Sequence, residues 1–360
     1  MLYLGIDVHR KQLTVSVRNE AGEVVLRRQV STEWPRVRAF FTELTERARP
    51  EGGYVAILEV CGFHEWVLKM LTEYGCRETV VVQPTGRSKK KTDRRDAQAL
   101  SETLWVNRDR LAAGQPIRGL RRIQPPAPLD AENRQLTALR VRMKQVRTRT
   151  LNKIHHILLK HNLHQECPTK GLATQRARQW LTKLALPELD RLEMDLLLEQ
   201  WTLWDRQLEK IEAQIAKRHA QSPTAVLIAS VPGAGAFGSL ALASRMNNIE
   251  RFARPGSLAN YWGLVPSVRN SGETTDRLGS ITKEGSRLAR FVLAQMVLHV
   301  LRRDPTMKQW YQRIKRRRGS KIARVAVMRR LATILWHMVK HHEPYHVGGS
   351  ARRPLPAVAG

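Results

Sequence analysis

Four acidic residues stand at positions where an ordinary structural role is hard to assign. Asp7 interrupts the apolar stretch "YLGIDVH", and Glu59 interrupts "AILEVCG" in the same way. Asp93 and Asp96 lie three residues apart in "KTDRRDAQAL", a spacing that places both on one face of a helix. Taken alone, Asp93 and Asp96 could simply form surface ion pairs with their neighbours. Together, four convergent carboxylates repel one another unless divalent cations lie between them. The set therefore predicts a site for about two Mg²⁺ ions, which would bridge the carboxylates to phosphate oxygens.

Cations surround this acidic set. The same stretch carries Lys89, Lys90, Lys91, Arg94 and Arg95, which we expect to hold a phosphate backbone next to the acids. The whole chain of 360 residues has 62 Lys and Arg against 32 Asp and Glu, a net charge of +30. A field of this strength concentrates polyanions, so nucleic acid is the expected partner.

The elements that must position the acids are strands and helices in alternation. Residues 1–110 contain five strand signals, "LYLGIDVH", "QLTVSVRN", "EVVLRRQV", "YVAILEV" and "ETVVVQP", with helical patterns at "WPRVRAFFTELTERA", "GFHEWVLKMLTEYG" and "DRRDAQALSETLW". The order predicts an α/β domain with a mixed five-stranded sheet. If the strands that carry Asp7 and Glu59 are parallel neighbours, the two carboxylates emerge close together.

The rest of the chain is predicted to be mainly helical. Residues 111–130 contain four prolines and have the composition of a linker. Residues 131–220 form the helical middle, and an apolar spacing of three and four predicts a coiled-coil or helical-hairpin seam. The seam consists of Met194, Leu197, Trp201, Trp204, Leu208, Ile211 and Ile215. Residues 221–345 form a C-terminal domain, and 346–360 are predicted to be a disordered tail.

Two further groups of cations are predicted to meet nucleic acid. Residues 134–160 hold eight Lys and Arg and no acid beside an apolar stripe, which favours a helix with one packed and one polyanion-binding side. Between Asp304 and Glu343 there are eleven Lys and Arg and no acid. The candidate contacts are Arg140, Arg142, Lys144, Arg147 and Arg149 in the first group and Arg316, Arg317 and Arg318 in the second.

A glycine-rich stretch, "GAGAFG", begins at Gly233. It fits the dinucleotide-binding pattern, but no acid follows in residues 251–272 and no second strand is evident, which argues against that function. With Pro232 before it, the stretch favours a helix-hairpin-helix-like turn. Backbone N–H groups near Gly233 and Gly235 could then accept a DNA phosphate, or the turn could have no ligand.

A polar loop, "RNSGETTDRLGSITKEGS", follows. Ser271 precedes a glycine there, with Arg269 before it and Lys283 behind it as further candidate nucleic-acid contacts. A loop serine is ordinarily a turn former, and composition alone favours that role.

Both halves of the chain resemble one family. The element order and the acidic set resemble the RuvC-like branch of the ribonuclease-H fold. More narrowly, "GIDVHRKQLTV", "LEVCGFHEW" and "KTDRRDAQALSE" are similar to the N-terminal domain of the DEDD insertion-sequence transposases, the IS-one-ten and IS-eleven-eleven group. "PGAG", "YWGLVP", "NSG", "GSITKEGSRLAR" and "ARVAVMRRLA" resemble the C-terminal domain of that group.

The resemblance implies a transposase, a DNA recombinase guided by a bridge RNA. It implies Asp7, Glu59, Asp93 and Asp96 as the metal-binding tetrad, with Mg²⁺ as cofactor, and Ser271 as the nucleophile on DNA, with Ser267 and Ser280 as weaker candidates. It further implies double-stranded target and donor DNA and a bridge RNA as partners, and a homo-oligomer, dimeric or tetrameric in a synaptic complex, whose active site is shared between protomers. Glu273 departs from the family, which often has a small or basic residue there.

Other features of the sequence narrow the compartment and the kind of protein to which the chain belongs. Cys61, Cys76 and Cys167 form no close-spaced pair, which fits a reducing compartment. No signal peptide or membrane span is expected, so the chain is predicted to be cytoplasmic, prokaryotic, and associated with the nucleoid when it acts. His337 and His341 have a spacing that can hold zinc, but helix-face histidines are the favoured interpretation. The alternative functions are a RuvC-like endonuclease without strand rejoining and a non-catalytic nucleic-acid-binding protein.

Overall fold

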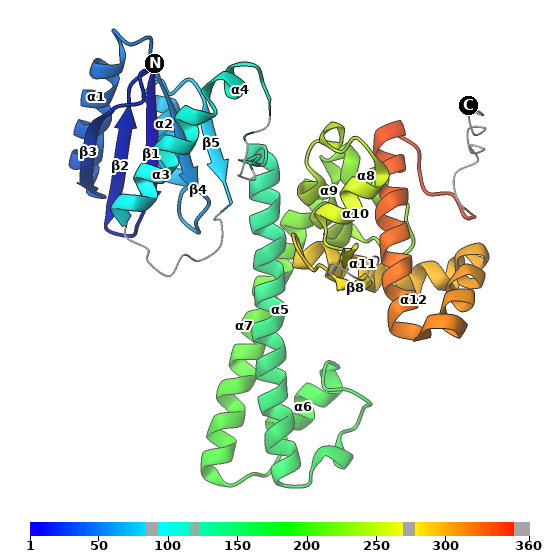
Figure 1. Ribbon diagram of the computed structural model, residues 1–360. Helices are drawn as coiled ribbons and strands as arrows, with labels where there is room; N and C mark the ends of the chain where they lie inside the picture. The colour runs from blue at the N-terminus through cyan, green and yellow to red at the C-terminus, as the bar shows by residue number, and fades with distance from the viewer. Residues whose placement is uncertain (84–92, 116, 118–121, 269–277, 349–360) are drawn as a thin grey trace, which may run out of the picture. The chain divides into compact units, whose positions relative to one another are not determined.

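The computed structural model describes residues 1–83, 93–115, 117, 122–268 and 278–348, without the side chains of residues 93–95 and 278 (Figure 1). Its contacts divide the chain into two compact units, Met1–Pro125 and Pro126–Gly360, each with its own hydrophobic core. Along the described residues, no helix combines the length and apolar character needed to cross a bilayer.

A six-stranded mixed sheet forms the centre of the first unit. Its strands are β1 (Leu2–Val8), β2 (Gln12–Arg18), β3 (Val24–Ser31), β4 (Tyr54–Glu59), β5 (Thr79–Val82) and β6 (Arg122–Ile123). The strand order is β3-β2-β1-β4-β5-β6. Strand β1 pairs in parallel with β4 and antiparallel with β2, so it lies in the middle of the sheet.

The prediction of five strands was wrong by one. Strand β6 pairs antiparallel with β5 and lies inside the proline-containing segment 111–130 that was expected to be a linker. A strand of two residues has no period to detect, so only the pairing reveals it. In the same segment Ile117 is buried in the core, and helix α5 already begins at Pro128.

Helices cover both faces of this sheet (Figure 1). Alternate residues of β1 and β4, among them Leu4 and Leu58, pack in one core with helices α1 (Trp34–Ala48) and α2 (Glu65–Glu73). The residues of opposite parity pack in a second core with helix α3 (Asp93–Val106). Helix α4 (Arg108–Ala112) follows α3.

A long helical hairpin begins the second unit. Helices α5 (Pro128–Lys160) and α7 (Glu188–Ala220) pack along each other, and η1 (His164–Glu166) and α6 (Gln175–Lys183) complete a small core near the tip. The predicted seam of α7 lies on the inner side of this pair. Of the two alternatives for the seam, the chain uses the hairpin within itself, with Trp201 fully buried.

The remaining helices form the C-terminal core. They are α8 (Pro223–Ile228), α9 (Ala236–Met246), η2 (Ile249–Arg251), α10 (Pro255–Tyr261), α11 (Arg287–Arg303) and α12 (Pro305–His341), and a hairpin of β7 (Pro266–Val268) and β8 (Leu278–Ile281) lies among them. Helix α12 is broken at Gly319, whose backbone is not helical.

Candidate active site

Asp7 and Glu59 lie at the same end of two central strands. Strands β1 and β4 run in parallel, as expected, and pair up to Ile6 opposite Leu58. The next residue on each strand is the acid. Since side chains alternate across a strand, Asp7 has the parity of Gly5 and Glu59 has that of Ile57. Both acids therefore stand on the face that α3 covers, in neighbouring strands about 4.8 Å apart.

Helix α3 reaches this face through an unusually close contact at Gly5. A Cβ atom at Gly5 would lie 2.3 Å from the carbonyl oxygen of Ala97 and 2.5 Å from the amide nitrogen of Ser101. Any larger residue would push the helix off the sheet. Farther along the helix, Trp105 donates its indole N–H to the carbonyl oxygen of Glu20 in the β2–β3 turn, at the opposite end of β1 from Asp7.

The direction of α3 points its first turn toward the end of the sheet that carries the two strand acids. From Ala97 back to Asp93 the helix advances about 6 Å. From Gly5 to Asp7 the strand advances about 6.6 Å, which is nearly the same distance. The helix thus starts at the level of Asp7, while Asp96 lies one residue before the contact at Ala97; the side chain of Asp93 lies outside the described part.

Asp7 has a partner that the sequence interpretation missed. Its Oδ2 lies 2.9 Å from Nε2 of His9, and the Asp7 side chain is 20% exposed. His9 follows two residues after Asp7, just past the end of β1. This i, i+2 spacing was the available signal, because it returns a side chain to the same side of an extended chain.

The donor chemistry of these residues fits a hard cation. Asp7, Glu59 and Asp96 offer only carboxylate oxygens, the ligands that Mg²⁺ prefers. Among the side chains that the structure describes, no three acids, histidines or cysteines close on a single ion position. The fold therefore sets Asp7 and Glu59 on one face at one end of the sheet, the face that the Asp96-bearing helix α3 covers, without the short distances of a formed metal centre.

Several predicted residues fall outside the described part of the chain. Lys89, Lys90 and Lys91 do, as do Arg269 and Ser271, and of Arg94 and Arg95 only the backbone at the start of α3 is described. The residues on either side of the serine loop are described. They are the antiparallel strands β7 and β8, in which the Ser267 hydroxyl donates to the carbonyl oxygen of Ser280 at 3.0 Å.

The glycine-rich stretch is a turn between helices α8 and α9, as predicted. Gly233 has φ +87°, and a Cβ there would lie 2.8 Å from the His299 side chain, so both the backbone and the space require glycine. Gly235 is the residue that caps the N-terminus of α9. The element immediately before this turn is helix α8 and not a strand, which agrees with the rejection of a dinucleotide fold.

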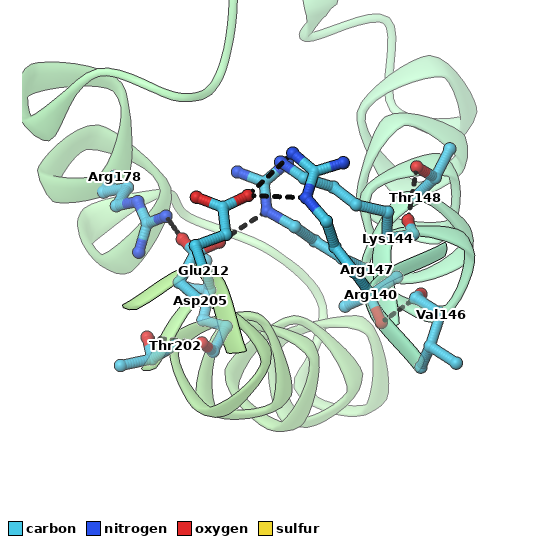
Figure 2. Close-up of polar contacts among 11 residues, drawn as sticks. Arg140, Lys144, Val146, Arg147, Thr148, Arg178, Thr202, Asp205 and Glu212 are labelled. Atoms are coloured by element: carbon cyan, nitrogen blue, oxygen red, sulfur yellow. Dashed lines mark hydrogen bonds and ion pairs between the residues drawn. The ribbon is translucent and has the colours of Figure 1, made fainter. Parts of the chain in front are cut away.

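The cations of α5 divide into two sets. Arg140 donates to Glu212 of α7, and Arg147 shares Asp205 of α7 with Arg178 of α6 (Figure 2). Arg140 and Arg147, which the sequence interpretation assigned to a polyanion, thus have acidic partners within the chain. These acids belong to a helix distant in sequence, since Arg147 and Asp205 are 58 positions apart.

The second set of α5 is exposed. No ion pair with any described residue is formed by Arg142, Lys144 and Arg149. The same holds for Arg316, Arg317 and Arg318, which lie immediately before the break in α12. Lys283, next to the β7–β8 hairpin, is exposed as well. These residues therefore remain candidate contacts for nucleic acid.

His337 and His341 stack on each other along α12. Their ring centroids are 6.0 Å apart with planes inclined by 18°, and Trp336 packs edge-on against the ring of His337. Burial, and then the proximity of His341, lowers the pKa of His337. This arrangement matches the helix-face interpretation, and no third ligand for a metal lies with them among the described residues.

Two family models match the chain. The DEDD transposase model of the IS110 group matches residues 4–163, and the model of the IS116/IS110/IS902 transposase family matches residues 225–312. The first covers the sheet, α3 and α5. The second covers the glycine turn, the serine loop and α11. Together they cover more than half of the chain.

Relatives of similar length support the same assignment. The chain is 25% identical to the transposase for insertion sequence element IS1111A of Coxiella burnetii, over 96% of this chain and 91% of that protein. It is 22% identical to a putative transposase of Sinorhizobium fredii, over 96% and 86%. It is 24% identical to a probable family 20 transposase of Pseudomonas aeruginosa, over 96% and 98%.

The domain matched by the DEDD model is the one in which Asp7 and Glu59 stand at the same end of neighbouring strands, and family membership implies an enzyme of DNA strand transfer that uses a divalent metal. The chain belongs to the IS110/IS1111 family of DEDD insertion-sequence transposases.

Proposed function

We propose that this transposase cuts and rejoins DNA through two linked centres, a Mg²⁺ site formed by Asp7, Glu59, Asp93 and Asp96 and a covalent phosphoserine at Ser271, with a bridge RNA selecting the DNA. The observation that carries the proposal is the register of β1 and β4, which puts Asp7 beside Glu59 under the start of α3.

The acidic site supplies electrostatic stabilisation. Mg²⁺ bound there would lower the charge on the phosphate and stabilise the leaving oxygen. Asp7 and Glu59 would hold such an ion from two paired strands, which cannot shift relative to each other without breaking the sheet. His9, hydrogen-bonded to Asp7, orients that carboxylate.

The serine supplies strand exchange. Attack by the Ser271 hydroxyl forms an Oγ–P bond and breaks one P–O bond of the DNA; the serine loses its proton and the departing DNA oxygen gains one. A DNA hydroxyl then attacks the same phosphorus and regenerates the serine. The energy of the phosphodiester is kept at each step, so rejoining needs no ATP. A water nucleophile would cut without rejoining.

One observation favours Ser271 over Ser267, which lies in the same matched segment, residues 225–312. The alternative Ser267 already uses its hydroxyl to bridge the two strands, and a Cβ at Gly279 would lie 2.5 Å from that oxygen. A hydroxyl packed in this way has a structural role.

The proposed RNA partner and self-association are supported by the hairpin. The exposed Arg142, Lys144 and Arg149 would let α5 bind an RNA backbone.

On the outer side of α7 four leucines are exposed at helical spacing, Leu189, Leu192, Leu196 and Leu203. A stripe of this kind fits a second copy of the chain. Leu196→Lys should lower the mass measured by light scattering; an unchanged mass would argue against this surface.

The test of the phosphoserine compares Ser271→Ala with Ser267→Ala in strand transfer with Mg²⁺. We expect Ser271→Ala to lose both recombination and the protein–DNA adduct seen on a denaturing gel, while Ser267→Ala keeps the adduct. Metal-dependent cutting that persists in Ser271→Ala would establish the endonuclease alternative instead.

The test of guidance is the nucleic acid that co-purifies with the protein from a bacterial cytoplasm. A discrete short RNA encoded beside the gene is the expected result. Recovery of unrelated RNA fragments alone, with recombination unaffected by ribonuclease treatment, would contradict guidance by RNA.

A further inference from the structure

We propose that a polar groove between β2, β3 and α3, directly beside the acidic residues, binds the sugar–phosphate backbone of the DNA strand that is being cut. This inference rests on the proposed function, because it assigns a binding site on the sheet to the DNA on which the acidic site would act. It is carried by cross-strand register, a cavity, and a buried hydroxyl without a partner.

The acids belong to a row that runs across four strands. Asp7 stands opposite Thr14 of β2, and Thr14 stands opposite Gln29 of β3. Residues directly opposite in antiparallel strands point to the same face. One line on the α3 face is therefore formed by Glu59, Asp7, Thr14 and Gln29. The line is acidic over β4 and β1, and it is polar but uncharged over β2 and β3.

The next row lies closer to α3. It consists of Ile57, Gly5, Ser16 and Arg27 in the same register. Ser101 of α3 donates to the Ser16 hydroxyl at 3.0 Å, which fixes the helix over β2. The edge strand β3 extends beyond the helix, and Arg27 and Gln29 are exposed there.

A cavity of about 350 Å³ occupies this place. Its lining comes from β2, β3 and α3 and consists of Thr14, Val15, Ser16, Arg27, Arg28, Gln29 and Gln98. Gln98 lies two residues after Asp96 on α3, so the same helix contributes an acid to the metal site and an amide to the groove. The groove and the acidic set thus share a strand boundary and a helix.

Thr14 lies at the boundary between them. It is only 3% exposed, and its hydroxyl has no hydrogen-bond partner within the described part of the chain. Burying a hydroxyl without a hydrogen-bond partner is unfavourable, so we expect a bound ligand to supply that partner. A ligand oxygen in the cavity would supply the missing bond after a rotation of the threonine side chain.

The chemistry of the lining indicates a nucleic-acid backbone. Arg27 has no ion pair with a described residue, so one positive charge is available on the α3 face, whereas Arg28 points to the other face and pairs with Glu43. Hydroxyl and amide groups surround Arg27, and no aromatic ring lines the cavity. A phosphate with its sugar matches one cation among hydroxyls and amides, while a stacked base would need an aromatic surface.

The distance places this contact next to the cut. Strands are about 4.8 Å apart, so Thr14 is one strand and Gln29 two strands from Asp7, about 5 and 10 Å away. A strand whose scissile phosphate lies over Asp7 and Glu59 therefore passes its neighbouring phosphate over Thr14 and toward Arg27. The groove would hold the DNA in place without contacting the reacting phosphorus.

The experiment measures strand transfer by the full chain with its co-purifying RNA, on duplex DNA carrying the ends of its own insertion element. Arg27→Ala and Thr14→Val are compared with Arg49→Ala, at the C-cap of α1, and Thr72→Val, on α2, the same substitutions made on the helices of the other face of the sheet. We expect Arg27→Ala to raise the DNA concentration at half-maximal rate about tenfold, and Thr14→Val by less, with the half-saturating Mg²⁺ concentration unchanged.

A second measurement identifies the phosphate. DNA with one uncharged methylphosphonate, moved stepwise away from the cut, should weaken binding by the wild type at one flanking position, and Arg27→Ala should remove that position's effect while leaving the others. Asp7→Asn is the reference for the proposed function. If Asp7→Asn is inactive but Arg27→Ala and Thr14→Val behave like their controls, the groove inference is wrong and the proposed function stands.

Two other outcomes are equally decisive. A shift of the Mg²⁺ dependence in Arg27→Ala would mean that the residue acts through the metal site, and would overturn the inference. Strand transfer retained in Asp7→Asn would overturn the proposed function itself, whatever the groove variants do.

Discussion

The sheet of the first unit and the α5–α7 hairpin of the second both bring charged residues together, but they do it in opposite ways. In the hairpin several acids lie against cations. Asp205 accepts from Arg147 and Arg178, and Asp190 accepts from Lys160 and His161 (Figure 2 shows the first set). In the sheet, Asp7 lies in register with a second acid, Glu59.

We propose that this difference separates charges that stabilise the fold from charges that take part in the reaction. An acid between two arginines stabilises the fold and gains nothing from a metal. Two acids placed side by side by a sheet are held against their mutual repulsion, an arrangement that a divalent cation would relieve. Acidic residues should therefore have different roles in the two regions, and substitutions in each region should have different effects on activity and stability.

The largest expected effect is that of Asp7→Asn in the sheet. We expect strand transfer to fall by more than about 100-fold, because an oxygen ligand with full charge is lost, while the free energy of unfolding changes little. The matched control is Asp109→Asn, an acid of the same unit whose side chain is 87% exposed. Loss of folding in Asp7→Asn, measured by circular dichroism, would place this acid with the structural ones.

Asp205→Asn should show the reverse pattern in the hairpin. It leaves Arg147 facing Arg178, whose guanidinium lies 3.8 Å from the centre of the Trp201 ring. We expect the free energy of unfolding to fall by about 2 kcal/mol, between the values for buried and exposed pairs. Asp195→Asn, which breaks only the exposed pair with Arg191, should cost well under about 1 kcal/mol in the same urea titration.

The pH dependence of the same pair gives a finer test. Burial raises the pKa of Asp205, but hydrogen bonds from Arg147 and Arg178 outweigh burial and leave that pKa below its ordinary value. A lowered pKa in the folded state stabilises above the unfolded value of about 3.9 and is lost as the pH falls through the folded value. The stability difference between wild type and Asp205→Asn should thus be constant from about pH 5 to 7 and shrink below about pH 4. A difference that grows on acidification would contradict the assignment.

The smallest expected effect compares cations within α5. Replacing the exposed Arg142 and Arg149 with alanine should lower the slope of log affinity against log salt by about 1.8, from two lost phosphate contacts. Arg140→Ala, which removes a residue already paired with Glu212, should change the slope by much less. Equal slopes for all variants, measured with a short RNA duplex, would mean that neither set contacts the backbone.

Much of the fold followed from local patterns. The stretch "LYLGIDVH" predicted the first strand, and the turn at Gly233 was predicted from its proline and glycines. The two-residue β6 could not be predicted, because its only signal is pairing with β5. The neutralisation of Arg140 and Arg147 was missed because periodicity describes one helix at a time, and the partner acids belong to α7.

The sequence by itself determined which residue types were present and which local element carried each of them: acids at strand ends, a D-x-x-D helix start, cations along α5. The tertiary structure alone decided which of these meet. Parallel pairing set Asp7 beside Glu59, the absent side chain of Gly5 admitted α3, and cross-strand register extended the acidic row to Thr14 and Gln29. Proximity between distant residues is a property of packing and register, which no single segment contains.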